Sequence, residues 1–242
     1  MFLKSLFSVV LCFIALCLKA QVADPTVYLN EIRHELQKKW PESRTVNLVF
    51  HGHSVPAGYF NTPHVNTLQS YPHLTLQTVK KYCPYAVVNS ITTAIGGENA
   101  EQGSARFVKD VLVHRPDVLF IDYALNDRRI GLERARKAWE TMIREALKQN
   151  VKVILMTPTP DLTEDILNPE TPLEKHAQQI RELARIYQTG LVDSYHAFKQ
   201  LRENGSDLKM YMSQSNHPNE KGHHAVSDLI AQWLLNFDQQ RQ

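Results

Sequence analysis

Five short apolar runs alternate with longer segments of helical periodicity, and this alternation limits the possible fold more than any other feature of the sequence. The runs are rich in valine, isoleucine, leucine and phenylalanine, as expected for strands that are buried on both faces. Such strands, separated by helices, are typical of a parallel sheet covered by helices on each side. We therefore predict an α/β fold, a three-layer α/β/α sandwich with strands at residues 46–50, 86–91, 118–123, 151–156 and 191–193.

The segments between these runs have the spacing of amphipathic helices. The most regular segment covers residues 132–147, where apolar side chains recur every three or four positions. Gly190 is expected to end the helix before the last strand, because glycine readily adopts the left-handed conformation of a C-cap. Residues 57–71 are rich in Asn, Thr, Pro and His and are predicted to form a loop beside the active site. The remaining helices are predicted at residues 26–39 and 74–82, up to about 114, through 180–187, up to about 202, and over 226–237.

Residues 1–20 differ from the rest of the chain. One lysine precedes an almost unbroken apolar run at residues 6–18, which is too short to span a bilayer comfortably. This pattern is typical of a secretory signal peptide, so we predict cleavage near Ala20, a single domain over residues 21–242, and a secreted or periplasmic protein without stable membrane insertion after cleavage. An uncleaved anchor is the alternative. Lipid attachment at Cys17 is less favoured, because the residue before it is a leucine.

The charge of the chain bears on its partners, and its cysteine content bears on what stabilises the fold. The chain has 27 Lys and Arg against 25 Asp and Glu, and removal of residues 1–20 takes away Lys4 and Lys19, which leaves 25 of each sign. A balanced charge gives no indication of nucleic acid or of an anionic membrane as a partner. Only Cys83 remains after cleavage, so no internal disulfide can form and the fold must depend on its apolar core.

Chemically useful residues follow the strands. Gly52-His53-Ser54 ends the first apolar run, and a buried strand that ends in this way places a hydroxyl at the carboxyl edge of the sheet, where α/β proteins bind ligands. By itself Ser54 would be interpreted as an ordinary turn residue. Gly97, Asn126 and His217 lie in three further loops expected at the same edge. A hydroxyl, a backbone amide, an amide side chain and an imidazole are the groups that acyl transfer requires.

These four segments resemble the four sequence blocks of the SGNH hydrolases, also called GDSL-type esterases, and the likeness extends over residues 45–237. The resemblance implies a flavodoxin-like sheet and hydrolysis of acyl esters without a metal or another cofactor. It implies that Ser54 is the nucleophile and that His217 is the general base. It also implies an oxyanion hole formed by the N–H groups of Ser54 and Gly97 and by the side-chain amide of Asn126.

The sequence departs from the family pattern at two positions. His53 stands where the family has an aspartate, a difference that we treat as minor. Gln214 stands where the family usually has the aspartate that orients the base. A glutamine can accept a hydrogen bond from His217 but cannot compensate the charge of an imidazolium, and a neutral amide in a serine-protease triad costs about four orders of magnitude. We favour a Ser–His dyad oriented by a backbone carbonyl over an acid supplied from elsewhere or a weakened enzyme.

Two other groups of residues follow the strands, three histidines and the pair Glu98-Asn99. His51, His53 and His64 could together hold a metal ion, but no Asp or Glu accompanies them in a ligand pattern, so surface or packing roles are favoured. Glu98 and Asn99 are expected to begin a helix, because an acidic residue suits its positive end.

The sequence therefore predicts an exported serine esterase that removes acetyl or other short acyl groups, with a small-molecule or polysaccharide ester as substrate. The preference for a carbohydrate depends on export, on a polar entrance at residues 59–71, and on the absence of an apolar lid segment from the sequence. A lysophospholipase or thioesterase of the same fold is one alternative. A carbohydrate-binding protein on a disabled hydrolase scaffold is another, which Gln214 keeps open.

Overall fold

The computed structural model describes residues 21–235, which form a layered α/β structure around a five-stranded parallel sheet. The strand order is β2-β1-β3-β4-β5, which is the flavodoxin-like order. This confirms the predicted three-layer α/β/α sandwich. The predicted signal peptide, residues 1–20, lies outside the described residues. The strands are β1 (Thr45–Gly52), β2 (Val87–Thr92), β3 (Val118–Asp122), β4 (Lys152–Met156) and β5 (Gly190–Val192).

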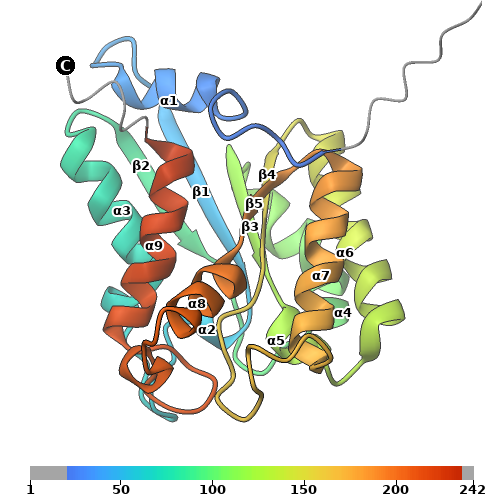
Figure 1. The fold of residues 1–242 in the computed structure, drawn as a ribbon. Coiled ribbons are helices and arrows are strands. Elements are labelled where there is room, and N and C mark those ends of the chain that lie inside the picture. Colours follow the sequence, from blue (N-terminus) through green and yellow to red (C-terminus); the bar gives the residue numbers. More distant parts are fainter. Residues whose placement is uncertain (1–20, 236–242) are drawn as a thin grey trace, which may run out of the picture.

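Helices cover both faces of the sheet because its central strands alternate apolar side chains between two separate core clusters. Phe50 and Phe120 stack on one face with ring centroids 4.5 Å apart, whereas Val49 and Leu119 point into the other cluster. Figure 1 shows α3 and α9 on one side of the sheet and α4, α6 and α7 on the other. The longer helices are α1 (Asn30–Gln37), α3 (Tyr71–Tyr82), α4 (Ala100–Asp110), α6 (Gly131–Lys148), α7 (Pro172–Tyr187), α8 (Ser194–Glu203) and α9 (Glu220–Leu234).

Several predicted helix ends differ from the observed ones, and two of these differences have a clear physical reason. The first helix begins at Asn30 rather than at residue 26, because the carbonyls of Pro25 and Thr26 accept hydrogen bonds from the guanidinium of Arg33 instead of continuing a helix. The expected C-cap at Gly190 is also incorrect. Gln188 takes the left-handed conformation with a φ of 51°, and Gly190 already belongs to β5.

Short elements were missed entirely. Two four-residue helices, α2 (Ser54–Ala57) and α5 (Ala124–Asp127), follow β1 and β3 directly, and a segment of one helical turn has no periodicity that a sequence pattern could reveal. Residues 21–235 also contain the 3₁₀ turns η1 (Thr67–Gln69), η2 (Leu112–His114) and η3 (Leu208–Tyr211).

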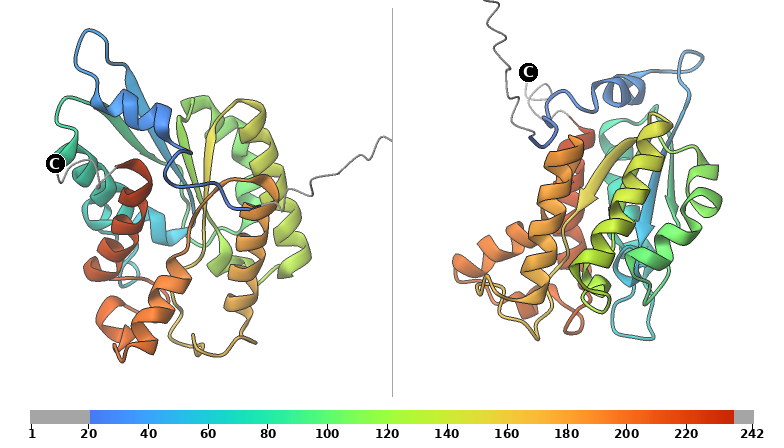
Figure 2. Two further views of the ribbon diagram at one scale, coloured as in Figure 1. Left: turned by 45° about the horizontal axis from the view of Figure 1, so that its top comes forward. Right: turned by 90° about the vertical axis from the view of Figure 1, so that its right-hand side faces the viewer.

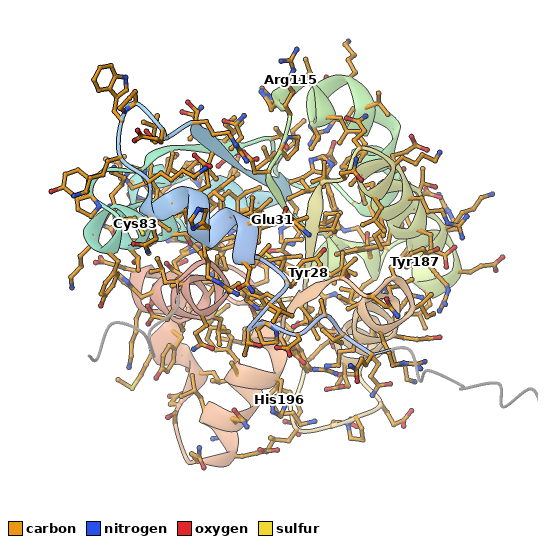
Figure 3. All side chains as sticks on the ribbon, turned by 90° about the horizontal axis from the view of Figure 1, so that it is seen from above. Tyr28, Glu31, Cys83, Arg115, Tyr187 and His196 are labelled. Atoms are coloured by element: carbon orange, nitrogen blue, oxygen red, sulfur yellow. The ribbon has the colours of Figure 1, made fainter. Side chains whose placement is uncertain are left out.

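The carboxyl ends of the strands meet at one end of the molecule. The right-hand view of Figure 2 places α1 at one end and the loop after β1 at the other. Figure 3 looks onto the α1 end, where Tyr28 lies near the middle; its hydroxyl donates to the Val153 carbonyl and accepts from the Val153 N–H, both at 3.1 Å. No helix within residues 21–235 has the length and apolar character needed to cross a bilayer.

Candidate active site

Ser54 is the first residue of α2, immediately after β1. As the first helical residue it has an N–H without a partner inside the helix, so that N–H is available to an anion. The helix is capped by His53, whose Nδ1 accepts from the Val55 N–H at 3.1 Å. Gly58 ends it with a φ of 89°, a conformation that favours glycine. Ser54, expected at the end of the first strand, therefore lies at a junction of strand and helix, at the carboxyl end of β1.

His217 meets Ser54 across the carboxyl edge of the sheet. The Nε2 atom of His217 lies 2.8 Å from the Ser54 Oγ, and both residues are buried. The Nδ1 atom of His217 lies 3.0 Å from the backbone carbonyl oxygen of Phe60. Because a carbonyl can only accept, Nδ1 carries the proton and Nε2 is left with the lone pair that can take the serine proton. Burial lowers the pKa of His217 below its usual 6.5, and the Phe60 carbonyl opposes this shift.

The loop that carries His217 is fixed by its own hydrogen bonds. The Ser213 N–H and Oγ both donate to the His217 carbonyl, at 2.9 and 3.0 Å. Asn219 caps α9 by accepting from the Gly222 N–H at 3.1 Å. A side chain at Gly222 would place its Cβ 2.3 Å from the Tyr211 carbonyl oxygen, so the close approach of this loop to α9 requires glycine. The imidazole is thus presented by a rigid support.

Gln214 does not occupy the position expected of an orienting residue. Its Oε1 accepts from the Thr62 N–H at 3.0 Å, and its Nε2 donates to the Asn216 Oδ1 at 3.1 Å. The contact to the His217 Nδ1 comes instead from the Phe60 carbonyl. Gln214 therefore connects the loop before α9 with the loop that carries Phe60, and the geometry is that of the dyad with a backbone carbonyl considered above.

The two other residues expected in an oxyanion hole come from adjacent loops. Gly97 is exposed, with a φ of 79° and no atom within 4 Å of an added Cβ. Asn126, on α5, donates one Nδ2 hydrogen to the Glu98 carbonyl at 2.8 Å, which leaves the second hydrogen for a ligand. The structure thus ties Asn126 to the residue that follows Gly97.

Buried acids lie beneath this edge. The Nε2 atom of His53 is 3.4 Å from the Asp122 Oδ1, and Tyr71 donates its hydroxyl proton to the Asp122 Oδ2 at 3.0 Å. Asp127 accepts from the Ala100 N–H and from the Trp139 Nε1–H, each at 2.7 Å. Burial raises the pKa of Asp127 to about 6. These groups tie β3 and α5 to the neighbouring helices.

The histidines named as alternative metal ligands are used otherwise. The Nδ1 of His51 lies 3.0 Å from the Thr93 Oγ1 and its Nε2 lies 3.1 Å from the Tyr123 hydroxyl. His53 caps α2, and His64 is exposed. Within residues 21–235, no three His, Cys, Asp or Glu side chains are grouped as metal ligands would be.

The sequence matches the model of the GDSL-like Lipase/Acylhydrolase family over residues 50–225. A search of curated proteins found no match. Among solved structures, the chain is similar to a two-domain esterase active on acetylated mannans, with a TM-score of 0.71 and 20% identity over 89% of this chain and 54% of that one. The chain thus spans about half the length of that esterase.

A second similar structure is the acetylxylan esterase Axe2 from Geobacillus stearothermophilus, with a TM-score of 0.68 and 18% identity over 78% of this chain and 94% of that one. At these identities the two structures establish a shared fold. The family match covers most of the chain, including the segments of Ser54, Gly97, Asn126 and His217. The chain belongs to the GDSL-like lipase/acylhydrolase family.

Proposed function

We propose that the protein is an exported serine esterase that removes acetyl or another short acyl group from a carbohydrate. The observation that carries this proposal is the 2.8 Å contact between the Ser54 Oγ and the His217 Nε2, with the opposite ring nitrogen held by the Phe60 carbonyl. A serine hydroxyl is a weak nucleophile until a base within hydrogen-bond reach accepts its proton. The 2.8 Å contact supports a role for His217 as that base.

In the proposed reaction the Ser54 Oγ attacks the acyl carbon while its proton moves to the His217 Nε2. The carbonyl oxygen becomes negative and is stabilised by the N–H groups of Ser54 and Gly97 and by the Asn126 amide. The imidazolium then returns the proton to the departing sugar oxygen, and an acyl-serine remains. Neutral His217 next takes a proton from a water molecule as the water oxygen attacks the acyl-serine. The imidazolium then returns this proton to the Ser54 Oγ as its bond to the acyl carbon breaks, which releases the carboxylic acid and restores neutral His217 and free Ser54.

A short acyl group is supported by the position of Tyr59. Its ring centroid lies 6.0 Å from that of His217, and a Cβ added to Gly96 would lie 3.1 Å from its hydroxyl oxygen. The ring therefore stands beside both the base and the glycine loop, where it would restrict a long acyl chain. The carbohydrate part of the proposal draws support from the esterases of similar fold, which act on acetylated mannans and on acetylxylan.

The proposal is tested with the protein lacking residues 1–20, assayed on 4-nitrophenyl acetate and on acetylated xylan and mannan oligosaccharides. Wild type should release acetate and react with a fluorophosphonate, whereas Ser54→Ala should do neither. If folded wild type shows neither activity nor labelling but binds deacetylated oligosaccharides in calorimetry, the protein is a binding protein. Turnover of lysophospholipids in preference to sugar esters would support the lipid alternative.

A further inference from the structure

Glu98, the residue after Gly97, is held from several sides. Its carboxylate accepts from the Arg106 Nε at 2.7 Å and from the Arg106 Nη2 at 2.6 Å. The Tyr123 hydroxyl donates to the same carboxylate at 2.8 Å. The backbone carbonyl of Glu98 accepts from the Asn126 Nδ2 at 2.8 Å. One residue thus connects two groups of the proposed oxyanion hole to a partly buried ion pair.

The ion pair is itself fixed to the sheet. The Arg106 Nη2 also donates to the Thr93 carbonyl at 2.6 Å, at the end of β2. The Tyr123 hydroxyl lies 3.1 Å from the His51 Nε2, and burial lowers the pKa of His51 to about 3, so the ring is a neutral partner. The helix α4 gives room for this contact at Gly103, where an added Cβ would lie 2.2 Å from the Tyr123 hydroxyl oxygen.

Gly97, in contrast, has little support of its own. It has a left-handed φ, and no atom lies within 4 Å of the position that its Cβ would take. Its position therefore depends on the chain on either side, where the Ile95 N–H donates to the Gly52 carbonyl at 3.0 Å and the Glu98 N–H donates to the Ile95 carbonyl at 3.3 Å. On one side that chain is Glu98, the most strongly bonded residue of the loop.

We propose that Glu98 is a positioning residue that sets the Gly97 N–H and the Asn126 amide together, with Arg106 and Tyr123 as its supports. This inference rests on the proposed esterase function. Arg106 has a second effect besides holding the Glu98 side chain. An ionised carboxylate one residue from the proposed oxyanion hole would oppose the negative charge that develops on the substrate oxygen. Arg106 neutralises that carboxylate and so removes the repulsion.

The test compares Glu98→Ala, Glu98→Gln and Tyr123→Phe with Glu101→Gln. The control, Glu101→Gln, breaks another Arg–Glu pair, that of Glu101 with Arg134. Glu101 lies on α4, as Arg106 does, but its ion pair is exposed and does not contact the glycine loop. We expect Glu98→Ala to lower kcat on 4-nitrophenyl acetate about a hundredfold with KM changed less than about threefold, as for loss of an oxyanion donor. Glu98→Gln retains an oxygen for Arg106 and should lose only about tenfold.

Binding of phenylboronic acid, which forms a tetrahedral adduct on serine, should weaken in parallel with kcat/KM, and Glu101→Gln should leave both values within about twofold. Amide NMR gives a reading that needs no activity. In Tyr123→Phe, which removes one support of Glu98 without changing a chain neighbour of Gly97, the Gly97 N–H and the Asn126 side-chain amide signals should both shift, and in Glu101→Gln neither should.

The outcomes separate the two proposals. If wild type turns over and its Ser54 is labelled, but Glu98→Ala retains its kcat or changes KM alone, only the positioning role is wrong. If wild type is inactive, the esterase proposal fails, and the NMR shifts still decide whether Glu98 holds both groups. Unshifted Gly97 and Asn126 signals would overturn the inference in either case.

Discussion

At the scale of single residues, the main feature is a histidine oriented by a backbone carbonyl. The Phe60 oxygen fixes the tautomer of His217 as a carboxylate would, but it carries no full charge to stabilise the imidazolium. The sequence could not reveal this contact, because any residue type supplies a carbonyl. It also could not reveal that Gln214 would bond to Thr62, which lies 152 positions away in the chain.

Gln214→Ala should therefore retain much of the activity. The side chain contacts Thr62 and Asn216 but not the imidazole, so its loss should loosen the loops and reduce kcat by about tenfold or less. His217→Ala removes the proposed base and should cost about four orders of magnitude or more. Steady-state hydrolysis of 4-nitrophenyl acetate by both variants checks this. Equal losses in the two would show that Gln214 acts on His217 after all.

The pH dependence of kcat/KM should report the pKa of the proposed base, His217. Only neutral His217 can accept the serine proton, and its pKa lies below 6.5 because the ring is buried. Activity should therefore rise with pH through a single step below 6.5 and be level above about pH 7.5. A rate profile in buffers of constant ionic strength measures the step. A midpoint well above 6.5 would mean that a negative charge reaches the imidazole in the working enzyme.

Tyr59→Ala should change which acyl groups are accepted. The ring stands against His217 and Gly96, so its removal opens space beside the proposed nucleophile. We expect the ratio of kcat/KM for 4-nitrophenyl butyrate over acetate to rise by about tenfold, the value of one or two methylenes in an apolar pocket. Tyr59→Phe keeps the ring and serves as the control. An unchanged ratio in Tyr59→Ala would place the acyl group elsewhere.

At the scale of elements, the sequence predicts what depends on burial and misses what depends on single turns. The strand predicted at 118–123 corresponds to Val118–Asp122, because a run buried on both faces leaves a continuous apolar pattern. The helices α2 and α5, which carry Ser54 and Asn126, leave no such pattern. Glu98 was expected to begin a helix, yet Asn99 is the cap and the Glu98 side chain pairs with Arg106.

The junction of β1 and α2 predicts a strong effect for Gly52→Ala. An added Cβ would lie 2.4 Å from the Asp122 carbonyl oxygen and 2.8 Å from the Pro56 Cγ, so β1 and β3 could not keep their present separation. We expect a loss of about 3 kcal/mol or more in the free energy of unfolding, together with loss of activity. Gly131→Ala, strained only by its φ of 79°, should cost about 1 kcal/mol. Urea unfolding of both variants checks the ranking, and equal costs would contradict it.

At the scale of the whole molecule, the parallel sheet brings together residues that are far apart in the chain. Ser54 and His217 are separated by 163 positions, yet both lie at the carboxyl edge because every strand points the same way. The same layering buries several imidazoles between sheet and helices. Burial lowers the pKa of His51 and His223 to about 3 and that of His176 to about 4.

These buried histidines should make the fold sensitive to mild acid. Each has a lower pKa in the folded chain than in the unfolded chain, where it is near 6.5, so stability is complete above 6.5 and is lost as pH falls toward the folded values. Each histidine contributes a loss of about 1.4 kcal/mol per pH unit in that window. Asp127 has the opposite effect, because its pKa is raised to about 6 in the folded chain. As the pH falls through about 6, Asp127 takes up a proton in the folded chain before it does so in the unfolded chain, and this offsets the loss of stability from one histidine.

Urea unfolding at pH values from about 7.5 to 4.5 should therefore show a falling free energy of unfolding, with most of the loss below 6.5. His176→Gln removes one of the protons taken up on unfolding, so the curve of this variant should fall less steeply by about 1.4 kcal/mol per pH unit. Stability that stayed constant between pH 6.5 and 5 would mean that these imidazoles are charged or solvated in the folded protein. A variant curve parallel to that of wild type would exclude His176 as a contributor.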